Sequence, residues 1–200
     1  MVYNFINVYM GLGNPIQPDP LNAGPSIRLT TPSGNASLPF QDGAYSISGL
    51  PPGTSAKGTY AFTGSGGPDI GAFSAQITFP GGGSAFNPSI PAGVTRSQGL
   101  TVTWTQPGIF DPDEFIQISG FAYVPNGPIG AEFVCNVPLA PGRFTIPPAV
   151  LLALPSQAGL NKPQAQLEVD IAIIKTFTAP GADVGTISWV FGNPQDFSYQ

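Results

Sequence analysis

Apolar and polar residues alternate with a period of two in many short runs of the chain. The run "FSAQITF" places Phe73, Ala75, Ile77 and Phe79 on one face and polar residues on the other. Successive side chains of a strand point to opposite faces, so this pattern predicts half-buried antiparallel strands with one wet face. Similar runs cover 100–105, 166–173 and 187–191, and further strands are expected at 26–31, 36–40, 43–48, 58–63, 115–124, 131–137, 143–147 and 195–199.

Turn-forming residues separate these runs, and only one segment has a helical pattern. Stretches such as "PSGN", "PNGP" and "PGAD" combine Pro, Gly, Asn and Asp, which favour turns. In "PPAVLLALP", Pro148 suits the first position of a helix and Pro155 ends it, so one short helix is expected near 148–154. The fold class predicted is all-β, an antiparallel β-sandwich.

The chain contains an internal similarity that suggests how the sandwich is divided. Residues 60–79 and 175–191 each have a strand ending in Phe-Thr, a Gly-rich turn with Asp-Ile/Val-Gly, and a second strand. We therefore expect two closely packed halves, 26–95 and 96–200, each with about the seven strands of an immunoglobulin-like sandwich. A single large sandwich remains the alternative.

Residues 1–25 are predicted to form a strand arm followed by a Gly/Pro-rich tether. In "VYNFINVYM" both faces of the strand are apolar, which is typical of a strand covered on both sides. Such an arm is suited to donation into the sheet of a neighbouring subunit, and it is equally suited to folding back onto its own domain. The residues expected to make the subunit contact are Val2, Tyr3, Phe5, Ile6, Val8, Tyr9 and Met10.

The composition indicates an extracellular surface with few charges. Only 8% of the residues are charged, and the net charge is −5, whereas about a quarter of the residues of ordinary soluble domains are charged. The 26 Gly and 24 Pro could indicate disorder, but 14 Phe and 6 Tyr supply a core. With no basic patch and no apolar stretch long enough for a membrane span, we expect neither nucleic acid nor a membrane-spanning segment.

Few residues are suited to catalysis or to cofactor binding. The chain has no His, no nucleophile elbow, no phosphate-binding glycine loop and no zinc spacing, so we expect no enzyme activity and no cofactor. The acidic cluster "FDPDEF", with Asp111, Asp113 and Glu114, is a calcium candidate whose spacing favours an ordinary solvated loop instead. Glu168 and Asp170 alternate outward and are assigned to a wet face.

The remaining candidates are one thiol and several aromatic residues. Cys135 shares a strand face with apolar neighbours and is expected to be a buried structural residue. Trp104 and Trp189 are in phase with apolar faces and are assigned to the core. Exposed rings near turns could instead bind sugars, and the candidates are Phe110, Phe121 and Tyr123.

Several stretches resemble a family of uncharacterised, secreted β-rich proteins of acidobacteria. They are "GTYAFTGSGGPDIGAFSAQITFP", "RSQGLTVTWT", "GAEFVCNVPLAPGRFTIPPAVLLALP" and "FTAPGADVGTISW", and the resemblance spans about residues 26–199. It implies an extracellular or cell-surface location and a sandwich fold, and it implies no activity. We therefore expect a self-associating structural or adhesive subunit, which could form filaments; the alternative is a module that binds a ligand such as a polysaccharide.

Overall fold

The structure is a computed structural model, and it consists mostly of strands. It describes residues 20–47, 57–79, 86–105, 113–124, 130–162, 164–192 and 194–200, together with the backbone of residues 5–7. The strands are β1 (Phe5–Asn7), β2 (Ser26–Thr31), β3 (Gly34–Gln41), β4 (Ala44–Tyr45), β5 (Gly58–Gly64), β6 (Phe73–Phe79), β7 (Pro88–Ser89), β8 (Gly93–Val94), β9 (Leu100–Trp104), β10 (Glu114–Tyr123), β11 (Gly130–Pro138), β12 (Arg143–Ile146), β13 (Ala165–Phe177), β14 (Gly185–Phe191), β15 (Gln195–Asp196) and β16 (Ser198–Tyr199).

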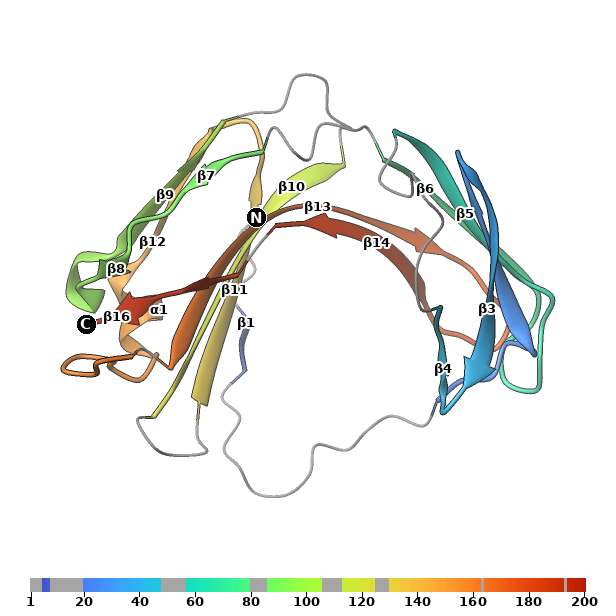
Figure 1. Ribbon diagram of the computed structural model, residues 1–200, viewed down its shortest axis with the longest axis horizontal. Helices are drawn as coiled ribbons and strands as arrows, with labels where there is room; N and C mark the ends of the chain where they lie inside the picture. The colour runs from blue at the N-terminus through green and yellow to red at the C-terminus, as the bar shows by residue number, and fades with distance from the viewer. Residues whose placement is uncertain are drawn as a thin grey trace.

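A long curved sheet forms the centre of the molecule. Its strand order is β1-β11-β10-β13-β14, with β15 paired to β13, and every pairing is antiparallel. The 13-residue strand β13 runs along the top of an arch, and Figure 1 shows one lobe of the molecule at each end of this arch. The sheet is therefore curled into a half-barrel with a convex and a concave face.

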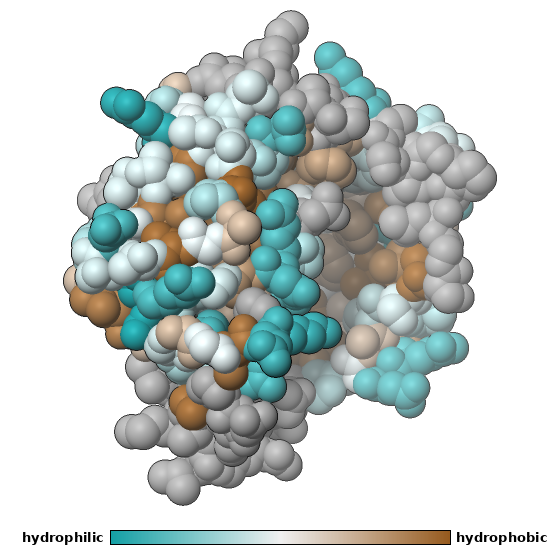
Figure 2. Space-filling view, turned by 60° about the vertical axis from the view of Figure 1, so that its left-hand side comes forward, coloured by the Kyte–Doolittle hydropathy of each residue, from teal (hydrophilic) through white to brown (hydrophobic). Residues whose placement is uncertain are grey.

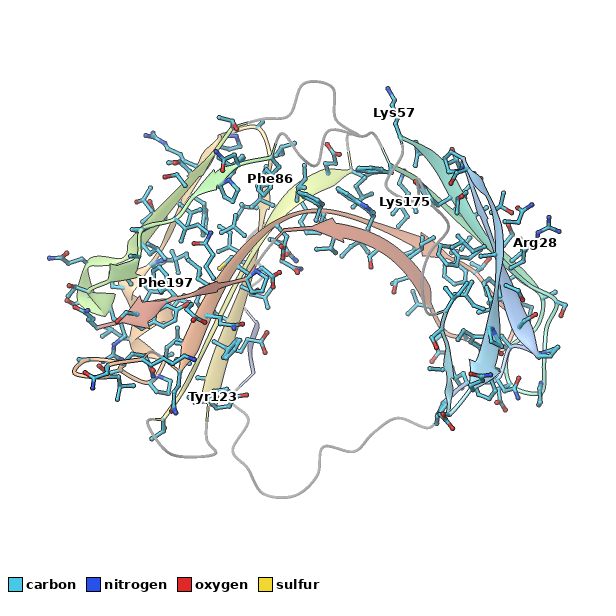
Figure 3. The ribbon with its side chains drawn as sticks, viewed as in Figure 1. Arg28, Lys57, Phe86, Tyr123, Lys175 and Phe197 are labelled. Atoms are coloured by element: carbon cyan, nitrogen blue, oxygen red, sulfur yellow. The ribbon has the colours of Figure 1, made fainter. Side chains whose placement is uncertain are left out.

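The large lobe is a sandwich between the long sheet and a smaller one. The small sheet, β12-β9-β7, packs on the convex face of β10, β11 and the first part of β13. Ile116, Ile118 and Val102 at their contact are fully buried. Phe197 and Tyr199 enter the same core from the C-terminal end of the chain, as Figure 3 shows for Phe197. This core holds most of the buried apolar side chains of the described residues.

The small lobe is built from the five-stranded sheet β4-β3-β2-β5-β6. Its inner face packs on the convex face of β14 and of the last part of β13. The contact buries Leu29 and Ile77 from the five-stranded sheet against Ile173 and Ile187 from the long sheet. Because β13 contributes to both cores, the two lobes share one continuous strand.

The two hairpins that resemble each other in sequence lie against each other in space. The rings of Phe73 and Phe177 are stacked with centroids 5.3 Å apart. The Gly71 N–H donates to the Pro180 carbonyl at 2.7 Å. Gly181 has φ +91°, and a Cβ there would overlap the Asp69 carbonyl oxygen, so only glycine fits this contact. The internal repeat therefore forms a packing interface within the small lobe.

The all-β class and the short helix are confirmed, with two corrections to the expected organisation. Helix α1 (Pro148–Leu152) begins at Pro148 as predicted and ends before 154. The two cores do not follow the predicted boundary between 95 and 96, because Ile173 and Ile187 complete the core of the first half. The expected antiparallel pairing also has one exception among the described strands, because the short strands β8 and β16 pair in parallel. Within the described residues, no helix is long and apolar enough to span a membrane.

Candidate functional sites

The concave face of the long sheet carries polar side chains in rows that follow the strand register. Asn136, Gln117 and Asp170 form one row across β11, β10 and β13. Ser119 and Glu168 lie in the next row. This face is opposite to the one that both lobes bury, because side chains alternate along each strand. It lines the inside of the arch in Figure 1.

Asp170 is the most unusual residue of this face. Its side chain is only 3% exposed, and Oδ1 has no hydrogen-bond partner among the described residues. Burial, the charge of Glu168 and a hydrogen bond to Glu168 raise the pKa of Asp170 to about 7. A Cβ at Gly192 would overlap Oδ1, so glycine at this position leaves room for the carboxyl group. The Asp170 carboxyl group therefore gains or loses its proton near neutral pH.

Amide and aromatic side chains lie on the same face as the carboxyl pair. Gln117 Nε2 donates to Asn136 Oδ1 at 3.2 Å. Phe121 and Tyr123 lie further along β10, near its end. Their rings make an edge-to-face contact, with centroids 5.6 Å apart. The buried Gln157 holds this end of β10, because its Nε2 donates to the Tyr123 carbonyl at 2.7 Å. The two rings thus lie on the same strand and the same face as Gln117, the central residue of the polar row.

The concave face has carboxylates and no cation. None of the side chains that β10, β11, β13 and β14 place on it is Lys or Arg, whereas Glu132, Glu168 and Asp170 are acidic. Figure 3 shows Arg28 and Lys57 pointing outward from the small lobe. Lys175 lies on the opposite face of β13, where its Nζ is 3.3 Å from Asp113 Oδ2. Anionic ligands are therefore a poor match for this face.

A second candidate site is an apolar groove in the small lobe, which we call the open groove. It has a volume of about 270 Å³ and lies between the five-stranded sheet and β14. Its lining is apolar except for two hydroxyl groups, and consists of Ile27, Phe62, Phe73, Ala75, Phe177, Thr186, Ile187 and Ser188. Figure 2 looks into the hollow between the lobes, where apolar surface shown in brown lines the depth.

The groove exists because the small lobe is an incomplete sandwich. The five-stranded sheet faces only β13 and β14 of the long sheet, and β14 has no strand on its other edge among the described residues. As a result, Ile27, Leu38 and Phe40 on the inner face of β2 and β3 are only half-buried. On the concave side, Val190 of the edge strand β14 and Ile174 of its neighbour β13 are exposed to 49% and 42%. A free strand edge thus lies beside apolar surface on both faces.

The structure describes only part of the predicted subunit contact. Strand β1 pairs with β11 of the same chain, with Phe5 opposite Val134, Ile6 opposite Phe133 and Asn7 opposite Glu132. This pairing covers three of the nine residues of β11. Val2, Tyr3, Val8, Tyr9 and Met10 lie outside the described residues, as do the side chains of Phe5 and Ile6.

The acidic calcium candidates do not form a site in the described part of the chain. Asp111 lies outside it, Asp113 is paired with Lys175, and Glu114 is buried at the start of β10. No group of three or more Asp, Glu, Cys or His side chains among the described residues is arranged to hold a metal ion.

The thiol and the two tryptophans singled out in the sequence pack in or against the two cores, and two of the candidate rings lie on the concave face. Cys135 is a buried free thiol whose pKa is raised by burial. Trp104 is buried and its Nε1 donates to the Leu139 carbonyl at 2.9 Å. Trp189 is half-buried, with its ring 4.2 Å from that of Phe79. Of the possible sugar-binding rings, Phe121 and Tyr123 lie on the concave face, and Phe110 is outside the described residues.

Sequence reasoning missed Gln117, Asn136 and the burial of Asp170. Alternation correctly assigned Glu168 and Asp170 to the face opposite the core, but a wet face was expected there. One signal was available: Ala172 and Ile174 continue the same face with apolar residues, which is unusual for an open surface. The row formed with Gln117 depends on strand order, which periodicity does not encode.

No protein-family model, no curated protein sequence and no solved structure matches the chain.

Proposed function

We propose that the protein is a non-enzymatic, extracellular structural subunit that associates with copies of itself through its N-terminal strand. In this proposal each lobe is an immunoglobulin-like module, and the small lobe is completed by residues 2–10 of another copy. Successive head-to-tail contacts of this kind form open filaments unless the rotation between subunits closes a ring. Such filaments would serve structure or adhesion at the cell surface.

The observation that carries the proposal is the outer edge of β14, which has no partner strand in the part of the chain that the structure describes and lies beside the open groove. Each additional strand on a sheet gains backbone hydrogen bonds along its length, and side chains of alternate residues fill pockets on either face. At β14 one face of an added strand would meet half-buried Ile27 and Phe62, and the other would lie beside exposed Val190. A strand that is apolar on both faces is required there.

The N-terminal arm has the pattern that this edge requires. Val2, Ile6, Val8 and Met10 alternate on one face, and Tyr3, Phe5 and Tyr9 on the other. Nine extended residues span about 30 Å, and the seven residues of β14 about 23 Å, so the arm covers the whole edge. In the structure Phe5–Asn7 pairs with β11 of its own chain, and this short pairing would be exchanged on assembly.

The donation is tested by removing the arm and returning it as a peptide. Full-length protein should form multimers in light scattering and filaments in electron micrographs, and a chain starting at residue 20 should remain monomeric. A peptide of residues 2–10 should bind the shortened chain and raise its Tm, because each buried Val, Ile or Met contributes about 1.5–3 kcal/mol before the cost of ordering the arm. Ile6→Asp should abolish the effect, whereas Asn7→Asp serves as the charge control.

The acceptor is tested separately by a matched pair of substitutions in β2. Ile27→Glu places a carboxylate in the open groove, and Thr30→Glu places one on the exposed outer face of the same strand. Only Ile27→Glu should prevent peptide binding. Monomeric full-length protein at high concentration, or equal binding to both variants, would contradict the proposal.

A further inference from the structure

We propose that the concave face of the long sheet binds a neutral oligosaccharide chain, with the Glu168–Asp170 pair at the polar centre of the site. This inference does not depend on self-association, because it concerns β10, β11 and β13 and not the open groove. It rests on one row of hydrogen-bonding groups, two rings on the same strand, and the absence of cations from the face.

The carboxyl pair is an uncommon feature for a sheet surface. A carboxylate that is 97% removed from solvent is costly unless its oxygens are paired, yet Asp170 Oδ1 has no partner among the described residues. Glu168, two residues along the same strand, is its hydrogen-bonded neighbour. Asp170 Oδ1 lies against Gly192 and has no exposed surface, whereas Glu168 is only half-buried, so Glu168 is the member of the pair that faces a ligand. A ligand hydroxyl group can donate a hydrogen bond to its carboxylate.

The neighbouring row supplies further groups for hydroxyl ligands. Gln117 lies directly opposite both Asn136 and Asp170, so two planar amides and a carboxyl span three adjacent strands. The Gln117–Asn136 hydrogen bond uses one amide N–H of Gln117 and leaves its carbonyl oxygen as an acceptor. This bond also orients the Asn136 amide, so both side chains are ordered before a ligand arrives.

The rings of Phe121 and Tyr123 extend the row in the direction of the strand. Tyr123 is 46% exposed, and Figure 3 shows it at the lower end of β10, at the rim of the arch. From Gln117 to Tyr123 the strand covers about 20 Å, which is long enough for several linked sugar rings. The apolar faces of sugar rings can pack on Tyr123 and Phe121, and their hydroxyl groups can reach the polar row.

The charge of the face selects among possible ligands. Polysaccharides with carboxylate or sulfate groups would meet Glu132, Glu168 and Asp170 without a compensating cation. An extended peptide gains most at a strand edge, where backbone groups are unpaired, and this face offers side chains alone. Neutral glycans fit because their hydroxyl groups are both donors and acceptors.

The inference is tested with full-length protein by affinity electrophoresis in gels containing soluble glycans. The neutral probes are mixed-linkage β-glucan, xylan, galactomannan and dextran, and the anionic probe is polygalacturonate. At least one neutral glycan should retard the protein, and polygalacturonate should not. If no neutral probe retards it, or if polygalacturonate retards it more strongly, the proposal is wrong.

Substitutions then locate the site. Gln117→Ala and Tyr123→Ala should each weaken binding of the retarding glycan by about threefold to tenfold, the range expected for one net hydrogen bond or one ring contact. Gln76→Ala removes an exposed amide from β6 in the small lobe and should leave the affinity unchanged. Circular dichroism of all variants checks that they are folded. Equal affinity of Gln117→Ala, Tyr123→Ala and native protein would place the binding elsewhere and overturn the assignment.

Discussion

The two lobes use the same architecture, a sheet packed on the long central sheet, and they differ in how completely they cover it. In the large lobe Ile118, Val102 and Leu167 are fully buried between two layers. In the small lobe five strands face two, and Leu38 on the inner face of β3 stays half-buried. The difference shows that the apolar content of a strand is not enough to bury it. Its burial also depends on how many strands of the opposite sheet cover it.

The largest expected effect compares matched truncations in the two cores. Ile118→Ala in the large lobe should lower the free energy of unfolding by about 2–5 kcal/mol, because it leaves a cavity in a closed core. Leu38→Ala should cost roughly 1 kcal/mol, since its site is already half open to solvent. Urea denaturation of both variants gives the comparison, and equal losses would mean that the small lobe is as closed as the large one.

The next effect concerns Asp170, which lies on the concave side of β13 between the lobes. Its pKa is about 7 in the folded chain, against a usual value of 3.8, so the folded state holds the proton more tightly than the unfolded state. Its contribution to stability is therefore complete below about pH 4 and is lost as the pH rises to 7. One pKa unit corresponds to about 1.4 kcal/mol, which gives an upper limit of about 4 kcal/mol.

Asp170→Asn separates this contribution from those of the other carboxyl groups. The variant should show a smaller fall in unfolding free energy between pH 4.5 and pH 7.5 than the native protein, measured by urea denaturation at both values. Asp196→Asn, at an exposed position on the neighbouring strand β15, should leave the fall unchanged. The same fall in Asp170→Asn as in the native protein would assign the pH dependence to other groups.

A smaller effect is expected where the two similar hairpins meet in the small lobe. Phe177→Leu removes the stacked ring on Phe73 while keeping most of the apolar volume, and should cost about 0.5–1.5 kcal/mol. Phe73→Leu and the double variant complete a double-mutant cycle in thermal denaturation. A coupling free energy of zero would show that the rings contribute burial alone.

The smallest effect is expected at the ion pair between Lys175 and Asp113, on the convex side of β13. Lys175→Ala breaks its contact with Asp113, whose side chain is mostly exposed, so the change should be at most about 0.5 kcal/mol and should shrink in high salt. Thermal denaturation in low and high salt measures it. A loss above 2 kcal/mol would mean that this pair holds the two lobes together.

Local patterns predicted the strands and the helix well, and the arrangement of the sheets poorly. Period-two alternation located "FSAQITF" as β6, and Pro148 located the start of α1, because both signals act within a few residues. The sharing of β13 between two cores arises from contacts between distant segments. Alternation assigns Ile171 and Ile173 to the same face, and it does not say that they belong to different cores.

The candidate sites could be predicted only where one strand carries the signal. Alternation predicts the correct face for Glu168 and Asp170, and the position of Phe121 and Tyr123 near turns makes them possible sugar-binding rings. The row with Gln117 and Asn136 needed the register of three strands. The open groove needed a count of strands on each side of the small lobe, since it is defined by what is missing opposite β2 and β3.

Strand β13 gives the molecule a path for mechanical load. If subunits are linked through the small lobe, tension on one subunit reaches its large lobe through the 13 residues of β13, which run without interruption from one lobe to the other. Its antiparallel neighbours β10 and β14 hold it by hydrogen bonds along most of its length, so pulling along the strand shears many bonds at once. A filament of such subunits would be stiff along its axis, and its lobes would not separate under tension before β13 is pulled from the sheet.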